Sequence, residues 1–168
     1  MRRQNIIRRL LYLHNWEFAN IFLLPVCLFV ILISAKVKNW QAYAFGIIVV
    51  CFILAQGTLY WHLKLQTVCK DEPALPSYFR PTFLFFQRSD IILLFGYPIL
   101  VASNKLLSPI DFQASLWSNG IFLFAILEYV NYYHYQLSHD NINDIRYLIK
   151  HRKIRRSPLY VDLQRHKQ

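Results

Sequence analysis

The sequence predicts an all-α integral membrane protein with four membrane-spanning helices. Of its 168 residues 55% are hydrophobic, yet the net charge is +10, so apolar and basic residues must be segregated along the chain. Its long apolar runs approach the ~20 residues that cross a hydrocarbon core of ~30 Å. The predicted spans are residues 18–37, 41–63, 90–107 and 114–137. We assign residues 1–139 to a membrane domain and residues 140–168 to a basic tail.

The segment before the first span, residues 3–15, has an amphipathic pattern. Arg8 and Arg9 fall opposite an aliphatic helical face formed by Ile6, Ile7, Leu10 and Leu11. This pattern is typical of a short helix lying in the membrane surface, and a simple extension of the first span is the alternative. The following apolar run, 18–35, is longer than the ~7–15 residues of a signal-peptide core, so we expect it to be retained.

The segment between the second and third spans, residues 64–89, combines proline with aromatic residues. Pro73, Pro76 and Pro81 argue against a continuous helix. The aromatic residues make the segment too apolar for a free linker. It is therefore predicted to lie at the membrane interface, between the second and third spans.

The distribution of cations predicts the orientation in the membrane. With four spans, 16 of the 19 Lys and Arg residues fall on the side of both termini, and only Lys36, Lys38 and Lys105 fall on the other. Lys and Arg are enriched in the cytoplasmic segments of membrane proteins. The sequence therefore predicts a multi-pass protein of the cell membrane with both termini in the cytoplasm.

The tail is predicted to form two helices. Asn143 can cap a helix over residues 143–155, and Ser157 followed by Pro158 is a typical start for a second, shorter helix. The tail also contains a basic cluster, expected to bind lipid or a partner: Lys150, Arg152, Lys153, Arg155 and Arg156. Each cation near an anionic leaflet contributes ~1 kcal/mol of attraction. A protein partner is the alternative, and nucleic acid is disfavoured because no aromatic platform accompanies the charge.

Glu128 is the principal candidate for an intramembrane functional group. It falls near the middle of the fourth predicted span, where ionisable residues usually face the bundle interior or water. It either binds a ligand or ion, or joins helices by hydrogen bonds, for which Gln56 is a candidate partner. On a helical wheel a polar stripe descends from Glu128 to the surface, interpretable as a proton relay, a headgroup-binding groove or an interfacial tyrosine belt. The candidate residues are Glu128, Gln56, Asn131, Tyr132, Tyr135 and His139.

No motif for a metal, a cofactor or a common catalytic reaction is present. The cysteines form no CxxC pair, and His134 and His139 do not share a helical face. P-loop, GxSxG and HExxH motifs are missing. We therefore expect no metal and no cofactor.

The favoured function is that of a non-enzymatic accessory or scaffold subunit whose basic tail contacts anionic lipid or a protein partner. Two alternatives stay open. One is a small transporter or channel using Glu128, which would need a homo-oligomer because so small a bundle leaves little room for a pathway. The other is a lipid-modifying membrane enzyme with Glu128, His134 or His139 as acid–base groups.

Overall fold

The computed structural model describes residues 2–34, 40–107, 112–138, 146 and 149–165. Within these residues the chain is all-helical, and only an isolated bridge joins Tyr135 and Arg156. The helices are α1 (Arg2–Ser34), α2 (Trp40–Lys70), α3 (Phe79–Leu107), α4 (Phe112–Tyr133) and α6 (Pro158–Arg165). The predicted all-α class is confirmed, and α1, α2 and α3 are long and apolar enough to cross a membrane. The fourth helix carries Asn119, Glu128 and Asn131 within its apolar run.

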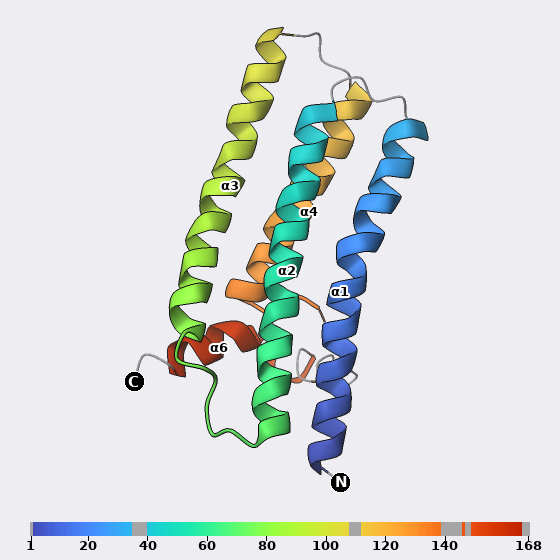
Figure 1. The fold of residues 1–168 in the computed structure, drawn as a ribbon. Helices are drawn as coiled ribbons and strands as arrows, with labels where there is room; N and C mark the ends of the chain where they lie inside the picture. The colour runs from blue at the N-terminus through green and yellow to red at the C-terminus, as the bar shows by residue number, and fades with distance from the viewer. Residues whose placement is uncertain (1, 35–39, 108–111, 139–145, 147–148, 166–168) are drawn as a thin grey trace.

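The four long helices run side by side, with α2 at the centre of the bundle (Figure 1). Helices α1, α3 and α4 each pack against α2, and α3 also contacts α4. In the most apolar window of each helix, 56% of α2 is buried, against 11% of α3 and none of α1. Helix α2 therefore supplies the core, while α1 presents most of its apolar surface to the surroundings.

Two glycines of α2 allow α4 to approach closely. A Cβ built on Gly46 would lie 2.9 Å from Cγ2 of Ile121, and one on Gly57 would overlap the phenol ring of Tyr132. Small residues at helix interfaces let backbones approach in membrane bundles, where packing contributes much of the attraction. The α2–α4 contact therefore depends on the missing side chains at both positions.

The predicted interfacial segment 64–89 is wrong in extent. Helix α2 continues past Leu63 to Lys70, and α3 begins at Phe79, well before the predicted start at residue 90. Pro81 does not interrupt α3, because it lies in the first turn, where a backbone N–H would have no intrahelical partner. Only residues 71–78 connect the two helices, and the N–H of Phe79 donates to the carbonyl of Pro76 at 2.9 Å.

The N-terminal segment is continuous with the first span and is not a separate surface helix. Helix α1 has 33 residues, about 50 Å at ~1.5 Å per residue, so it exceeds the ~30 Å hydrocarbon core. Near its N-terminal end, Arg3 donates to the carbonyls of Val68 and Cys69 at 2.9 and 3.3 Å. These contacts satisfy carbonyls of the last turn of α2, which have no partner within the helix. The first turns of α1 are thus held against α2.

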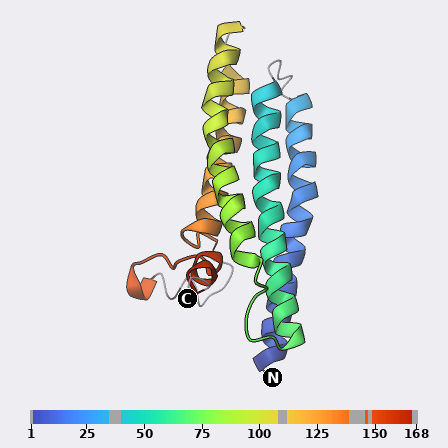
Figure 2. The same cartoon turned by 60° about the vertical axis from the view of Figure 1, so that its left-hand side comes forward.

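Helix α6 lies across the bundle beneath the end of α4 (Figures 1 and 2). Ser157 joins the two helices: its hydroxyl donates to the carbonyl of Tyr132 and accepts from the N–H of Tyr160 at 3.0 Å. The second of these bonds is an N-cap, and Pro158 occupies the first helical position. Leu159 and Leu163 belong to the core of the bundle.

A buried carboxylate also anchors α6. Asp162 accepts a hydrogen bond from the hydroxyl of Tyr60 at 2.7 Å and pairs with the ammonium of Lys64 at 2.6 Å. Both partners come from α2, so the last helix is held by packing and by charge. The division into residues 1–139 and 140–168 stays a prediction, although residues 157–163 share the core of the bundle. Of the other predicted tail helix, 143–155, the structure describes residue 146 and residues 149–155, and helical structure there ends at residue 151, short of the predicted end.

Candidate functional site

A polar trio lies buried at the centre of the bundle. The amide of Gln56 donates to Asp90 Oδ1 at 2.7 Å, and the hydroxyl of Tyr133 donates to Gln56 Oε1 at 2.6 Å. All three side chains are at most 2% exposed. The trio joins α2, α3 and α4, and enclosed polar groups of this kind specify how helices pack. None of its members lines the cleft described below.

The trio corrects two expectations. Gln56 does not bond to Glu128, because its amide is occupied by Asp90 and Tyr133. Asp90, expected at the start of the third span, lies well inside α3 and is fully buried. Because Asp90 is charged, it was expected to mark the end of the span. It can lie inside the helix because the amide of Gln56 donates a hydrogen bond to one of its carboxylate oxygens.

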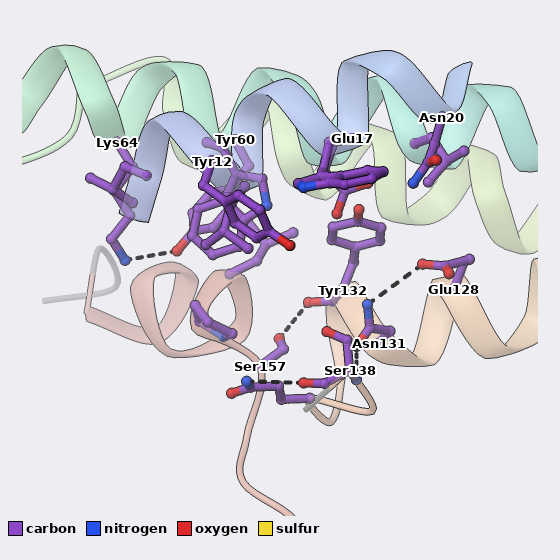
Figure 3. A pocket seen from close by; sticks show the side chains of 18 of the residues that line it. Tyr12, Glu17, Asn20, Tyr60, Lys64, Glu128, Asn131, Tyr132, Ser138 and Ser157 are labelled. Carbon is purple, nitrogen blue, oxygen red and sulfur yellow. Dashed lines mark hydrogen bonds between the residues drawn. The ribbon is translucent and has the colours of Figure 1, made fainter. Parts of the chain in front are cut away.

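The candidate functional site is a cleft of about 690 Å³ between α1, α2, α4 and the chain leading into α6 (Figure 3). We call it the α1–α4 cleft. It extends from the end of the bundle that carries α6 to the middle of the helices. Its deep end is apolar and is formed by Leu24, Leu54 and Phe124, one from each of the three long helices that line it.

The middle level of the α1–α4 cleft is polar. Glu17 and Asn20 point from α1 toward α4, where Glu128, Asn131 and Tyr132 line the opposite wall (Figure 3). Carboxylate oxygens accept hydrogen bonds, so this level offers acceptors from two helices to a bound group.

Asn131 organises the α4 wall at the point where the helix ends. Its Nδ2 lies 3.5 Å from Glu128 Oε2, and its Oδ1 accepts from the N–H groups of Leu137 and Ser138 at 2.8 and 3.1 Å. Asn131 is the one hydrogen-bond partner of Glu128 that the described part of the chain provides. Asn131 thus fixes the turn after α4 and leaves capacity on Glu128 for a ligand.

The mouth of the cleft is basic and aromatic. Arg9 of α1, Lys64 of α2 and Arg155 of the tail line it, although they are far apart in the sequence. Aromatic residues from α1 and α2 surround them: Tyr12, Trp16, Tyr60 and Trp61. The indole N–H of Trp61 is buried without an acceptor among the described residues.

The predicted sites are only partly brought together. Glu128, Asn131, Tyr132 and Arg155 line one cleft, and Gln56 belongs to the separate trio. Tyr135 does not continue the polar stripe, because α4 ends at Tyr133 and the guanidinium of Arg156 lies 4.6 Å from the ring of Tyr135. The remaining tail cations, Lys150, Arg152 and Lys153, are exposed and do not line the cleft, and His139 lies outside the described residues.

The α1 wall of the cleft was missed by sequence reasoning. Six of its members recur along the helix every three or four residues, which places them on one face: Ile6, Arg9, Leu13, Glu17, Asn20 and Leu24. This periodicity was visible in the sequence. It was overlooked because the segment 3–15 was considered separately from the first span.

In the described part of the chain, no group of three or more His, Cys, Asp or Glu side chains is placed to hold a metal ion. Cys27, Cys51 and Cys69 are free thiols. The lining of the α1–α4 cleft offers charged groups, hydrogen-bonding groups and aromatic rings to a bound molecule.

No protein-family model, curated protein or solved structure matches the chain. Two features of the structure bear on function. They are the three helices that are long and apolar enough to cross a membrane, and the α1–α4 cleft.

Proposed function

We propose that the chain is a four-span protein of the cell membrane with both termini in the cytoplasm, and that it acts as a non-enzymatic accessory or scaffold subunit binding anionic lipid at its basic end. The observation that carries this proposal is the position of the cations. The N-terminal end of α1, the connection between α2 and α3, and α6 all lie at one end of the bundle (Figure 1).

The tail contributes an exposed cationic surface to this end. Lys150, Arg152 and Lys153 are exposed, and the segment that carries them projects from the bundle beside α6 (Figure 2). Arg156 has a different role, since its guanidinium packs against the rings of Tyr135 and Tyr160 at 4.6 and 5.1 Å. At ~1 kcal/mol per cation, the three exposed side chains contribute about 3 kcal/mol toward an anionic leaflet. The packing of α6 keeps them close to that surface.

The positive charge of the tail would also suit an acidic protein partner. Lipid is favoured because α6 lies at the same end of the bundle as the N-terminal turns of α1 (Figure 1). Those turns contain Arg3, Arg8 and Arg9. A surface built from several segments suits a planar charged leaflet better than it suits one short acidic peptide.

Transport through the cleft receives less support. A pathway that uses Glu128 must continue to the other end of the bundle. The lining of the cleft, as far as the described residues define it, stops at Leu24, Leu54 and Phe124. The described lining ends near the middle of the bundle, which favours binding of a ligand over its transport across the membrane.

Lipid binding by the tail can be tested with the triple variant K150Q/R152Q/K153Q. The protein is reconstituted in nanodiscs of mixed phosphatidylcholine and phosphatidylglycerol and released for native mass spectrometry. We expect the wild type to retain phosphatidylglycerol preferentially. The triple variant should lose most of that preference, because about 3 kcal/mol of attraction is removed. Raising the salt concentration should weaken the wild-type preference, because exposed charges are screened over ~8 Å at physiological ionic strength.

A matched control removes the same charge elsewhere at the same end of the bundle. Lys70 and Arg88 are exposed and Arg80 is half-buried, and none of them belongs to the tail or lines the cleft. The variant K70Q/R80Q/R88Q should keep more of the preference than the tail variant. Equal losses would show that total charge matters and would contradict a specific role for the tail. A wild-type protein that retains both lipids equally would overturn the proposal.

A further inference from the structure

We propose that the α1–α4 cleft binds a single-chain phospholipid, with the phosphate at the basic mouth, a free hydroxyl or amine of the backbone at the acidic middle level, and the acyl chain at the apolar end. The inference rests on the proposed membrane location and goes beyond it, because it concerns one bound molecule and not the surface of a leaflet.

The first support is the order of chemistry along the cleft. Arg9 and Arg155 lie at its mouth, Glu17 and Glu128 at the middle, and Leu24, Leu54 and Phe124 at the deep end. A phospholipid whose chain enters the bilayer presents its groups in this same order, from phosphate to backbone to hydrocarbon. The volume of the α1–α4 cleft, about 690 Å³, falls within the ~300–1,000 Å³ of ordinary small-molecule sites.

The second support is the chemistry of the mouth. Guanidinium groups bind phosphate oxygens in a planar, two-pronged geometry, and Arg9 and Arg155 supply two such groups from opposite ends of the chain. The ammonium of Lys64, also at the mouth, pairs with Asp162 at 2.6 Å. Trp61 adds a buried indole N–H that lacks an acceptor within the described residues, and a ligand oxygen would satisfy it.

The third support is the need for a donor at the middle level. Glu128 has one described partner, Asn131, at 3.5 Å, so its acceptor capacity is largely unused. The ester groups of a diacyl phospholipid can only accept hydrogen bonds, whereas a single-chain phospholipid carries a free hydroxyl or amine there that donates. A carboxylate in a site favours ligands that carry a matching donor over ligands that lack one. Glu128 is therefore the residue that favours the single-chain form.

The fourth support is access from the bilayer. Helix α1 packs against α2, but its most apolar window has no buried residue, so the side of α1 that faces away from α2 is exposed to the surroundings. An acyl chain can therefore lie against α1 while its polar part occupies the cleft.

Binding can be measured by quenching of tryptophan fluorescence, since Trp16 and Trp61 line the cleft. The purified full chain in neutral nanodiscs is titrated with a chain-brominated monoacyl phosphatidylglycerol and with its diacyl counterpart. We expect the monoacyl probe to bind at least about tenfold more tightly, the equivalent of about 1.4 kcal/mol. Competition by monoacylglycerol, which has no phosphate, should be at least about tenfold weaker than by the unlabelled monoacyl phospholipid.

Substitutions of Glu128 and Arg9 test which part of the lipid binds at the middle level and which part binds at the mouth. Glu128→Leu should abolish the preference for the monoacyl over the diacyl probe, while Glu128→Gln, which keeps an acceptor oxygen, should retain part of it. Arg9→Gln should weaken both probes about equally, by roughly tenfold. Glu72→Gln is the control, because Glu72 is exposed and lies outside the cleft. Thermal unfolding of each variant checks that the fold is intact.

Several results would overturn the inference. One is equal affinity for the two probes, and another is an unchanged preference in Glu128→Leu. Competition by inorganic phosphate as strong as by the monoacyl phospholipid would assign the mouth to free phosphate. The tail variant K150Q/R152Q/K153Q should leave monoacyl binding unchanged. The experiments therefore distinguish a failure of the proposed lipid binding in the cleft from a failure of the proposed lipid binding by the tail.

Discussion

Gly57→Ala is expected to lower the free energy of unfolding of the bundle by about 1–3 kcal/mol, as overpacking of a close-packed interior does. The added Cβ would overlap the ring of Tyr132, which belongs to α4 and is 4% exposed. The ring has little room to move, because Tyr132 belongs to the buried core of the bundle. The change can be measured by titrating the protein in mixed micelles with sodium dodecyl sulfate and following the loss of helical ellipticity.

Gly120→Ala is the matched control for this effect. Gly120 lies on α4, and a Cβ built there meets no atom within 4 Å. Alanine should therefore be neutral or stabilising, by up to about 1 kcal/mol, because it favours helix more than glycine does. In the double variant Gly57→Ala/Tyr132→Ala the clash is removed, so the two changes should be less destabilising together than their sum. A Gly57→Ala variant as stable as the wild type would contradict the close packing of α2 and α4.

Asp90→Ala is expected to destabilise the bundle by about 1–2 kcal/mol, because a buried donor loses its acceptor. Gln56 Nε2 donates to Asp90 Oδ1 at 2.7 Å, and both side chains are at most 2% exposed. The same micelle titration measures the change in the free energy of unfolding. Asp90→Asn should be milder, since the asparagine carbonyl oxygen can accept the same hydrogen bond.

Two controls test whether the effect belongs to the buried trio. Glu72→Ala removes an exposed acid of the connection between α2 and α3 and should change stability by less than about 0.5 kcal/mol. Tyr133→Phe removes only the hydroxyl that donates to Gln56 Oε1 at 2.6 Å, so an intermediate loss is expected. Asp90→Ala and Asp90→Asn variants with equal stability would show that the bond to Gln56 contributes little.

The sequence was sufficient for the class of fold, because apolar length alone identifies helices that can cross a bilayer. The sequence did not predict where these helices begin and end. Helices α1 and α2 extend beyond their apolar runs, where hydropathy no longer reports on helical structure. Proline was also overweighted: Pro81 lies in the first turn of α3, where it is tolerated.

The site was predictable only where one helix carries it. Glu128, Asn131 and Tyr132 share a face of α4, so helical periodicity placed them together. The contribution of Arg155 to the same cleft depends on the turn after α4 and on the docking of α6, which no local pattern encodes. Asp90 was missed for the same reason, since its burial depends on an amide of another helix.

The central claim is that four crossings bring both basic termini to the cytoplasmic face, and labelling of single cysteines in intact cells tests it most directly. In a background without Cys27, Cys51 and Cys69, the probes are Asn5→Cys in α1, Gln41→Cys near the start of α2 and Lys153→Cys in the tail. All three positions are exposed.

A membrane-impermeant maleimide should label Gln41→Cys in intact cells, and Asn5→Cys and Lys153→Cys only after permeabilisation. Labelling of both Gln41→Cys and Lys153→Cys in intact cells would mean that α3 and α4 do not both cross, which would contradict the four-span account. Labelling of Asn5→Cys and Lys153→Cys but not Gln41→Cys would reverse the proposed orientation.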